Sequence, residues 1–339
     1  MSGAPDLSIF IVTWNVREFV LECLRSIESD PDAPPLEVIL VDNGSHDGTV
    51  AAVLEQFPAT RVLANSQNVG FSRANNQALT LARGTYVLYL NADTALYPGT
   101  LRACMSELAA HPDVGLVGCR LESPDGRIQY DCARRFYRFR HLVYEVLYLH
   151  MFFPRSRVFA DHVLGHWDHR DRRDVEAITG AFMMVPRHVA VEVGGLPEEV
   201  FLYHEDLSFC LRVQRTGRRV RYLGDVRAVH HGGQATRKSS ARWGLLEVEC
   251  KHRFVREADG PMWGAAARAV LGLRALLRIG LGAAGSLLPA RWTQRYPRVF
   301  DIGLYWLQLR WCVSPESVAG HMPHAPEVSS EPLRLGAWT

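Results

Sequence analysis

Short apolar runs recur along the first ninety residues of the chain, separated by longer stretches of mixed polarity. The runs at residues 7–13 (LSIFIVT) and 36–41 (LEVILV) are rich in β-branched side chains and too short for helices. They therefore predict buried parallel strands. Residues 61–64 and 85–90 (TYVLYL) predict two further strands.

The stretches between these runs have apolar residues at helical spacing. Residues 17–29, the segment that ends at Phe57 and residues 72–83 predict three helices, and Asp47 or Thr49 is suited to cap the second. Strands that alternate with helices of about a dozen residues indicate right-handed βαβ units. We therefore predict an α/β fold with a mostly parallel central sheet flanked by helices. Ligands of such sheets bind beyond the carboxyl ends of the strands.

Carboxylates follow two of the predicted strands, at Asp42 and Asp93. After the first strand the chain reads Thr13, Trp14, Asn15, with no G-x-G-x-x-G fingerprint, and it has no Walker pattern and no G-x-S-x-G elbow. Dehydrogenase, P-loop NTPase and α/β-hydrolase functions are therefore disfavoured. Mg²⁺ and Mn²⁺ are commonly bound through one or two carboxylates and substrate phosphates, so the strand ends suggest a metal that holds a diphosphate.

Seven short motifs occur in one order between residues 7 and 240. They are LSIFIVTWN, VDNGSHDGT, NVGFSRANNQAL, YLNADT, ITGAFMMVPR, FLYHEDLSFCLR and AVHHGGQAT. Together they resemble the inverting nucleotide-sugar glycosyltransferases of family 2 with the GT-A fold, in the rhamnosyltransferase-like subgroup. Residues 134–157 and the sequence LGHWDH also resemble that subgroup.

The resemblance implies a metal site for Mg²⁺ or Mn²⁺. The family's D-x-D element is here Asn91, Ala92, Asp93, so Asp93 is implied as the metal ligand and Asn91 contributes at most a neutral oxygen or a contact to the donor's ribose. His230, by its H-x-G-G spacing, is implied near the metal or the diphosphate. A loop at residues 236–238 is implied to close over the phosphates. The alternative for Asn91 and Asp93 is a turn cap.

The resemblance also implies the nucleotide-sugar contacts. Asp42 is implied to accept a hydrogen bond from the pyrimidine base, which suits a side chain that only accepts. Gly180 is implied at the floor of the donor and acceptor pocket, with a simple buried strand as the alternative. The remaining implied contacts, for which turn chemistry is the alternative, are Thr13, Asn15, Asn68, Gly70 and Asn75.

Two acidic residues, Glu205 and Asp206, precede an amphipathic helix predicted at residues 207–216. A carboxylate at a helix N-terminus is stabilised there and is often only a cap. The resemblance implies instead that Asp206 is the general base that deprotonates the acceptor hydroxyl, with Glu205 beside it in the catalytic pair. Ser208 stands where the family often has a further aspartate.

The net charge of +2 conceals an uneven distribution. Residues 251–311 hold ten Lys and Arg against three Asp and Glu, and residues 134–173 hold nine against four. No nucleic-acid-binding motif accompanies this surplus. Residues 134–157 interleave aromatic residues with arginines, and residues 263–291 are an Ala- and Leu-rich run with arginines at 268, 274 and 278. Both compositions favour helices that lie on an anionic membrane with arginines at the headgroups; ordinary packing helices are the alternative.

The cellular location is predicted from what the sequence lacks. Its seven cysteines show no paired spacing, which fits a reducing compartment, and no export signal or uncharged stretch of eighteen apolar residues occurs. We therefore expect a cytoplasmic enzyme at the inner face of the cell membrane. The sequence leaves its oligomeric state open.

We predict three parts: a GT-A domain at 1–240, with nucleotide-binding and acceptor halves at about 7–120 and 121–240, a helical and membrane-associating region at 241–314, and a disordered tail at 315–339. By resemblance, the function is transfer of rhamnose from dTDP-rhamnose to a hydroxyl of a lipid-linked or polysaccharide acceptor in cell-envelope glycan synthesis. The alternatives are transfer of galactose, mannose or N-acetylhexosamine, and an inactive homologue that only binds a sugar nucleotide or glycan. A nucleotidyltransferase is disfavoured because residues 13–18 lack a loop rich in glycine and lysine.

Overall fold

A computed structural model describes residues 4–199, 204–232, 241–285 and 301–314. They belong to two compact units. We call the first the sheet unit (the described parts of 1–136 and 163–237) and the second the helical unit (those of 137–162 and 238–322). Residues 137–162 thus group with the C-terminal helices, a grouping that our predicted boundaries did not include. The expected phosphate loop at 236–238, the end of the run at 263–291 and the tail at 315–339 lie outside the described residues.

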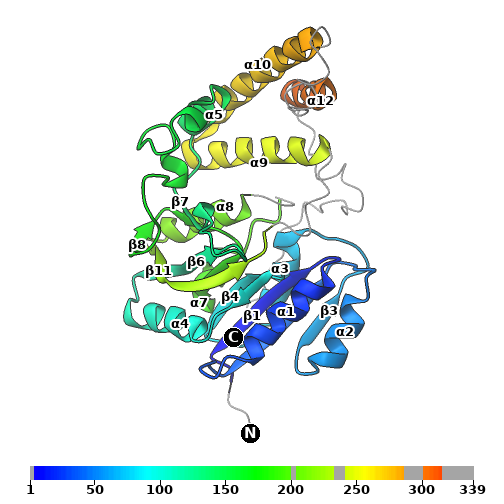
Figure 1. The fold of residues 1–339 in the computed structure, drawn as a ribbon, viewed down its shortest axis with the longest axis vertical. Helices are drawn as coiled ribbons and strands as arrows, with labels where there is room; N and C mark the ends of the chain where they lie inside the picture. The colour runs from blue at the N-terminus through cyan, green and yellow to red at the C-terminus, as the bar shows by residue number, and fades with distance from the viewer. Residues whose placement is uncertain (1–3, 200–203, 233–240, 286–300, 315–339) are drawn as a thin grey trace. The chain divides into compact units, whose positions relative to one another are not determined.

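The sheet unit contains eleven strands. They are β1 (Leu7–Thr13), β2 (Leu36–Asp42), β3 (Arg61–Ala64), β4 (Tyr86–Asn91), β5 (Thr94–Leu96), β6 (Val114–Glu122), β7 (Ala133–Arg134), β8 (Arg172–Val175), β9 (Ala177–Ile178), β10 (Phe182–Pro186) and β11 (Arg219–His230). Nine form one sheet in the order β3-β2-β1-β4-β10-β6-β11-β5, with β8 paired to β11, while β7 and β9 pair with each other (Figure 1).

The four predicted strands are confirmed as β1 to β4, and they run parallel to one another. β6 and β11 are also parallel, whereas β10 runs antiparallel to both β4 and β6. The predicted α/β fold is therefore confirmed. The four strands that are all parallel to one another, β1 to β4, come from the N-terminal part of the chain. The edge strands β5 and β8 are antiparallel to β11.

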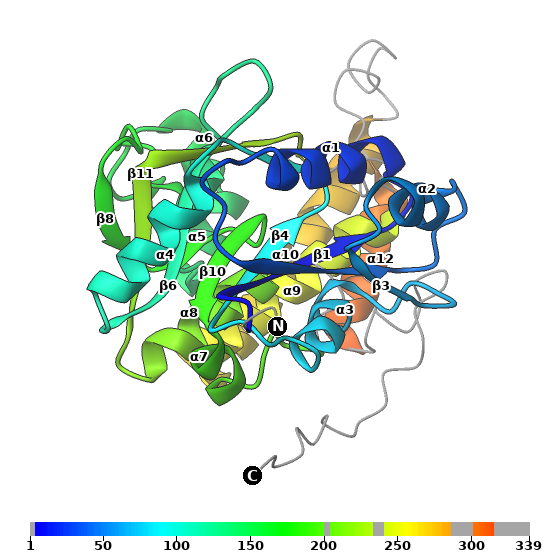
Figure 2. The same ribbon diagram turned by 90° about the horizontal axis from the view of Figure 1, so that it is seen from below.

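Helices cover both faces of the parallel strands. Figure 2 shows α1 and α2 on one side of β1 and α3 on the other. The bounds are α1 (Arg17–Glu28), α2 (Thr49–Gln56), α3 (Phe71–Leu79), α4 (Thr100–Ala110), α7 (Arg187–Glu192) and α8 (Glu205–Arg215), with short 3₁₀ turns at Tyr130–Cys132 and Asp161–Val163. Because both faces are covered, side chains at successive positions of β1, such as Ile9, Phe10 and Ile11, are all fully buried.

The helical unit consists of α5 (Phe139–Val146), α6 (Leu149–Phe152), α9 (Ala241–Asp259), α10 (Pro261–Gly285) and α12 (Ile302–Val313). α10 packs against α9, α12 and α5. Gly260 joins α9 to α10 with φ of 100°, a conformation that favours glycine. A Cβ at Gly264 would lie 2.8 Å from the Arg256 Cβ, so the close approach of these two helices requires a glycine there.

The two basic segments differ from the arginine placement that we predicted. Arg278 is buried, with its guanidinium over the Tyr148 ring, and the Arg274 guanidinium lies 4.0 Å from the Glu145 carboxylate. For Arg274 and Arg278 the expectation that the guanidinium reaches lipid headgroups is therefore wrong, because a carboxylate and an aromatic ring within the unit already bind them. Phe136 and Tyr137 are likewise buried.

Apolar residues of the helical unit nevertheless reach the surface. Met151, Phe152 and Phe153 are 52 to 74% exposed. On α10 and α12, the exposed apolar side chains are Met262, Trp263, Leu273, Leu276, Leu277, Leu281, Ile302, Trp306 and Val313. None of the described helices is both long enough and apolar enough to span a membrane.

Candidate active site

The strand register brings three predicted site residues to one edge of the sheet. Thr13 pairs with Asp42 across β1 and β2, and Val12 pairs with Asn91 across β1 and β4. Thr13, Asp42 and Asn91 therefore stand in one row at the carboxyl ends of adjacent parallel strands. This is the edge at which open α/β sheets bind their ligands.

Asp42 uses its two carboxylate oxygens differently. Oδ2 accepts hydrogen bonds from the backbone N–H groups of Gly44 (3.1 Å) and Ser45 (2.9 Å). Oδ1 is buried and has no hydrogen-bond partner among the described residues. The turn role that the sequence left open is thus real, but it occupies only one oxygen. The other retains its capacity to accept a bond from a ligand.

Three further buried polar atoms near this edge lack partners among the described residues: Thr13 Oγ1, Ser72 Oγ and Asn75 Oδ1. Ser72 and Asn75 belong to α3, which packs on β1 and β2. The amide nitrogen of Asn75 donates to the Phe71 carbonyl (3.0 Å) and so fixes the side chain. Because a buried polar group without a partner is costly, such a cluster indicates that a polar ligand completes the bonding.

The loops at this edge are shaped by the other predicted residues. Asn15 has φ of 54° and accepts a hydrogen bond from His46 N–H (2.8 Å), which ties the loop after β1 to the loop after β2. Asn68 accepts from Gly70 N–H (2.9 Å), and Gly70 has φ of 89° at the start of α3. The side-chain oxygens of Asn15 and Asn68 thus serve the backbone, as the turn-chemistry alternative supposed.

A second cluster lies where β4 and β11 end. The His230 Nε2 atom lies 3.3 Å from Asp93 Oδ1 and 3.4 Å from the Asn91 amide nitrogen. Asp93 is only 8% exposed, and its carbonyl accepts from His231 N–H. The amide nitrogen of Asn91 is thus the atom of that side chain that faces the histidine. Ala92, between Asn91 and Asp93, is buried.

Gln129 holds His230 by both ends of its amide. The His230 Nδ1–H donates to Gln129 Oε1 (2.7 Å), and Gln129 Nε2 donates to the His230 carbonyl (2.6 Å). With the proton on Nδ1, the Nε2 lone pair is left facing Asp93. Such a bond to the second ring nitrogen is how proteins fix the tautomer of a metal-binding histidine.

The donor set at Asp93 and His230 fits a divalent cation that is completed by its substrate. Within the described ranges, no group of three or more His, Cys, Asp or Glu side chains is arranged to hold a metal. Asp93 Oδ1 and His230 Nε2 nevertheless lie 3.3 Å apart. One carboxylate oxygen and one imidazole nitrogen are suitable partial ligands for Mn²⁺ or Mg²⁺ when diphosphate oxygens and water supply the remaining ligands.

Asp206 lies in the first turn of α8 and is 7% exposed. Its Oδ2 accepts from the Arg134 guanidinium (2.6 Å) and from Gly180 N–H (3.0 Å), and its Oδ1 accepts from Leu207 N–H (2.7 Å). A carboxylate has about four lone-pair positions, so these three bonds orient Asp206 and still leave it able to accept another proton donor. Burial opposes the charge of Arg134, but the combined attraction of Asp206 and its other acidic neighbours outweighs burial and raises the pKa of the guanidinium.

The backbone at Gly180 connects Asp206 to the strand edge. Gly180 N–H bonds Asp206, while the carbonyl of its neighbour Ala181 accepts from Asn91 N–H (3.1 Å). A Cβ at Gly180 would lie 3.6 to 3.9 Å from atoms of Asp206, Phe71 and Glu205. The start of α3, the end of β4 and the acidic turn of α8 therefore meet around one glycine.

Comparison with known proteins shows which family this chain is similar to. Residues 8–165 match the family described as Glycosyl transferase family 2. Over 297 residues the chain is 26% identical to an N-acetylglucosaminyl-diphospho-decaprenol L-rhamnosyltransferase from Mycobacterium tuberculosis, an alignment that covers 84% of this chain and 95% of the relative. The protein is a glycosyltransferase that resembles family 2 over residues 8–165. It is also 27% identical over 251 residues to the O-antigen biosynthesis protein RfbC of Myxococcus xanthus, of which it covers 18%.

Solved structures agree on the fold of this glycosyltransferase. A mannosyltransferase from Pyrobaculum calidifontis, solved with GDP-Man and Mn²⁺, superposes with a TM-score of 0.55 at 20% identity and covers 93% of this chain and 89% of its own. GalNAc-T7, solved with UDP, GalNAc and Mn²⁺, superposes with a TM-score of 0.54 at 13% identity, over 76% of this chain and 48% of its own. The GT-A fold expected from the motifs is thereby confirmed.

Two residues of the candidate site were missed by sequence reasoning. Gln129 lies in a turn-rich stretch after β6, and no motif marks it. Arg134 opens the aromatic and basic segment that we interpreted as a membrane contact, whereas its guanidinium binds Asp206 inside the sheet unit. Each of the two lies about 70 to 100 positions in sequence from the residue that it contacts. A local sequence pattern therefore cannot indicate either contact.

Proposed function

We propose that this glycosyltransferase moves rhamnose from dTDP-rhamnose to a hydroxyl of a lipid-linked or polysaccharide acceptor in cell-envelope glycan synthesis, with inversion at the anomeric carbon. The sugar and the acceptor class are supported by the rhamnosyltransferase relative, which aligns along 95% of its length. The transfer chemistry is supported by one structural observation: an oriented carboxylate, Asp206, is joined through Gly180 and Ala181 to an edge with unpaired polar atoms.

The unpaired atoms suit the nucleotide of the donor. Asp42 Oδ1 is an acceptor for the ring N–H of a thymine base, and its orientation is set by the two backbone bonds to Oδ2. Thr13 and Asn75 supply a hydroxyl and an amide oxygen for the deoxyribose. Because these groups are held in place before binding, little ordering entropy is lost when the donor enters.

Asp93 and His230 would hold Mg²⁺ or Mn²⁺. When bound, the cation would neutralise charge on the departing diphosphate. Gln129 keeps the His230 Nε2 lone pair toward Asp93, so that the pair presents one oxygen and one nitrogen to the same point. The Asn91 amide nitrogen lies 3.4 Å from His230 Nε2, so Asn91 borders this pair where the family motif has its first carboxylate.

Asp206 acts as the general base in this proposal. It takes the proton of the acceptor hydroxyl while that oxygen attacks the anomeric carbon. The bond from this carbon to the diphosphate oxygen breaks, and its electron pair leaves with the nucleotide diphosphate. Arg134 and Gly180 N–H are the positioning groups that hold the carboxylate in place. Glu205, in the same turn of α8, borders Gly180 with Asp206.

The helical unit supports association with a membrane. Its exposed apolar side chains include Phe152 (74% exposed) on α6 and Leu276 (54% exposed) on α10, and α10 also carries Arg268, Arg274 and Arg278. Exposed apolar groups beside cationic ones are typical of proteins that bind the surface of an anionic bilayer. We expect the enzyme at the inner face of the cell membrane, where a lipid-linked acceptor is presented.

A donor screen tests the proposal. Purified protein is incubated with Mn²⁺ or Mg²⁺, a membrane extract as the source of acceptor, and one of dTDP-rhamnose, UDP-galactose, GDP-mannose or UDP-N-acetylglucosamine. Metal-dependent release of dTDP from dTDP-rhamnose alone is the expected result. Release from another donor would overturn the choice of sugar, and binding of a donor without release under any condition would indicate a binding protein.

A further inference from the structure

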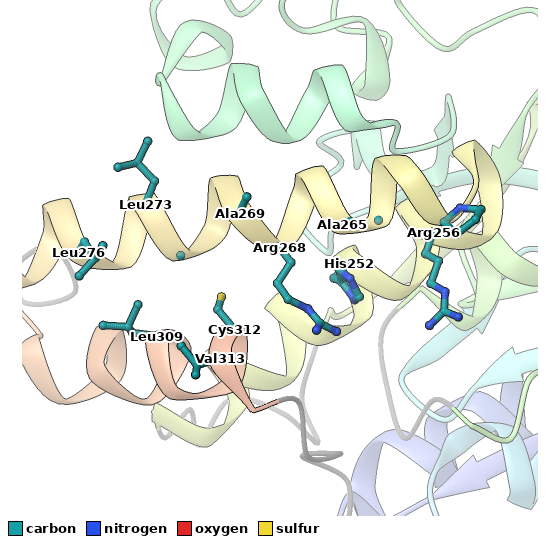
Figure 3. A pocket seen from close by; sticks show the side chains of 13 residues that line it. His252, Arg256, Ala265, Arg268, Ala269, Leu273, Leu276, Leu309, Cys312 and Val313 are labelled. Carbon is teal, nitrogen blue, oxygen red and sulfur yellow. The ribbon is translucent and has the colours of Figure 1, made fainter.

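A groove of about 730 Å³ lies within the helical unit, between the end of α9, α10 and the end of α12. Figure 3 shows Arg256, Arg268 and His252 toward one end and Leu276 and Leu309 toward the other. Its volume is in the range of pockets that enclose small-molecule ligands, roughly 300 to 1,000 Å³. The groove thus has a cationic end and an apolar end.

The groove stays open because α10 presents small residues along it, among them Ala265, Ala269 and Gly272. A Cβ at Gly272 would make only ordinary contact with Cys312, at 3.6 Å from its Cβ. The space is therefore created by side-chain size rather than by poor helix packing.

The cationic end has no anion of its own. Arg253, one turn before it, pairs with Glu249 at 2.9 Å, but neither Arg256 nor Arg268 forms an ion pair with any described carboxylate. The Arg268 Nε atom is buried without a hydrogen-bond partner among the described residues. Burial and the charges of Arg268 and Arg256 lower the pKa of His252 to about 4, so this histidine is neutral near pH 7. The Arg268 guanidinium lies 5.6 Å from the centroid of the Trp311 ring, so the two arginines face the groove without a carboxylate partner among the described residues.

The apolar end continues onto the exposed surface of α10 and α12. Leu273 is 59% exposed, Leu276 is 54% exposed and Val313 is 80% exposed. Burying such apolar area against a hydrocarbon chain stabilises a complex. A free phosphate would leave these side chains in water, and an apolar peptide would leave the arginines without an anion. An amphiphile with one phosphate and a hydrocarbon chain satisfies both ends.

We propose that this groove binds one anionic phospholipid of the membrane, with its phosphate on Arg256 and Arg268 and an acyl chain along Leu276 and Leu309. The proposal goes beyond glycosyl transfer and depends on neither the donor site nor Asp206. It assigns the helical unit a specific lipid site, in addition to general contact with the bilayer surface.

Cys312 provides a probe inside the groove. All seven cysteines lie in the described residues, and six are buried, whereas Cys312 is partly exposed. Burial raises the pKa of its thiol to about 11, so alkylation by a maleimide is followed over hours at pH 8.5 and located by peptide mass spectrometry. The added ligands are dihexanoyl phosphatidylglycerol below its micelle concentration, dihexanoyl phosphatidylcholine and inorganic phosphate.

Dihexanoyl phosphatidylglycerol should slow alkylation of Cys312 about tenfold at saturation, and Arg268→Gln should raise its half-protecting concentration roughly tenfold, the loss of one charge-assisted contact. Arg310→Gln removes an exposed arginine of the helical unit that lies outside the groove. This variant should change the half-protecting concentration less than about twofold. Ala269→Phe, which fills the groove, should abolish protection by lipid while circular dichroism stays unchanged.

The proposal is overturned if phosphate alone protects as well as the phospholipid, if phosphatidylcholine protects equally, or if Arg268→Gln behaves like Arg310→Gln. Protection that grows with protein concentration and needs no lipid would identify a second copy as the occupant. Faster alkylation after removal of residues 315–339, again without lipid, would identify the chain itself. Either outcome would also overturn the proposal.

Discussion

Asp42 in the sheet unit and Glu145 in the helical unit are two largely buried carboxylates with opposite surroundings. Asp42 Oδ1 has no partner among the described residues. Both oxygens of Glu145 accept from Lys251 at 2.9 Å, and Tyr137 O–H donates to Oε2 at 2.7 Å. An unpaired buried acceptor indicates a ligand, whereas a fully paired one indicates a contribution to stability. Mutations in the two units should therefore have different consequences.

The largest expected effect is that of Asp206→Asn. Without a base the acceptor hydroxyl keeps its proton, and kcat/KM with dTDP-rhamnose should fall roughly 10²- to 10⁴-fold. Binding of dTDP, measured by calorimetry, should stay near the wild-type value. Asp113→Asn, at an exposed carboxylate of the same unit, is the control and should leave turnover intact. A variant Asp206→Asn with nearly normal turnover would refute the base assignment.

Glu145→Leu should affect stability instead. It leaves the Lys251 ammonium buried without its main partner, and removal of one member of a buried ion pair typically costs about 3 to 5 kcal/mol. Urea denaturation should show this loss, while dTDP affinity of the folded protein stays unchanged. Glu247→Gln removes the more exposed partner of Lys251 and should cost less than about 1 kcal/mol. Equal losses of stability in both variants would show that Glu145 contributes no more than Glu247 to holding Lys251.

Acid should weaken the helical unit through the same carboxylate. Burial opposes ionisation of Glu145, but the Lys251 ammonium and the Tyr137 hydroxyl outweigh it and lower the pKa of this carboxyl to about 2. Its contribution to folding, about 3 kcal/mol, is complete above pH about 4.5 and is lost as pH falls toward about 2. Denaturation measured across this pH range should show the loss in the wild type and a shallower dependence in Glu145→Gln.

Gln129 is expected to affect metal binding in the sheet unit through its hydrogen bonds to His230. Gln129→Leu removes the acceptor for His230 Nδ1–H, so the ring can turn or change tautomer, and Mn²⁺ affinity in the presence of dTDP should fall roughly 10- to 100-fold. Gln129→Glu keeps the acceptor for Nδ1–H but loses the donor to the His230 carbonyl, so it should preserve more of the affinity than Gln129→Leu. Electron paramagnetic resonance of bound Mn²⁺ measures both variants without turnover. Unchanged Mn²⁺ affinity in Gln129→Leu would show that the hydrogen bonds between Gln129 and His230 have no role in metal binding.

The smallest effect is expected from Asp42→Asn. The amide oxygen still accepts from the loop N–H groups, but the amide nitrogen then faces a base N–H that also donates. Affinity for dTDP should fall about tenfold with little change in melting temperature. Asp47→Asn, whose carboxylate accepts hydrogen bonds from Thr49 and from the backbone N–H of Arg17, is the matched control. If both variants bind dTDP normally, Asp42 is a turn residue only.

Much of the sheet unit was predictable from local pattern. Residues 7–13 form β1 with the predicted bounds, and the bounds of β2 and β4 differ by one residue from the prediction. The predicted helix at 207–216 begins two residues earlier, at Glu205, which places Glu205 and Asp206 in its first turn. Whether these residues perform the proposed chemistry stays a prediction.

The sequence by itself determined the strand–helix alternation, the positions of the strand ends and the family, because apolar periodicity and short motifs are local properties of the chain. Only the tertiary structure decided which long-range partners complete each site. It placed Gln129 on His230, Arg134 on Asp206 and Arg278 on Tyr148. Such pairings depend on sheet register and helix packing, which join residues far apart in sequence and leave no trace in any single segment.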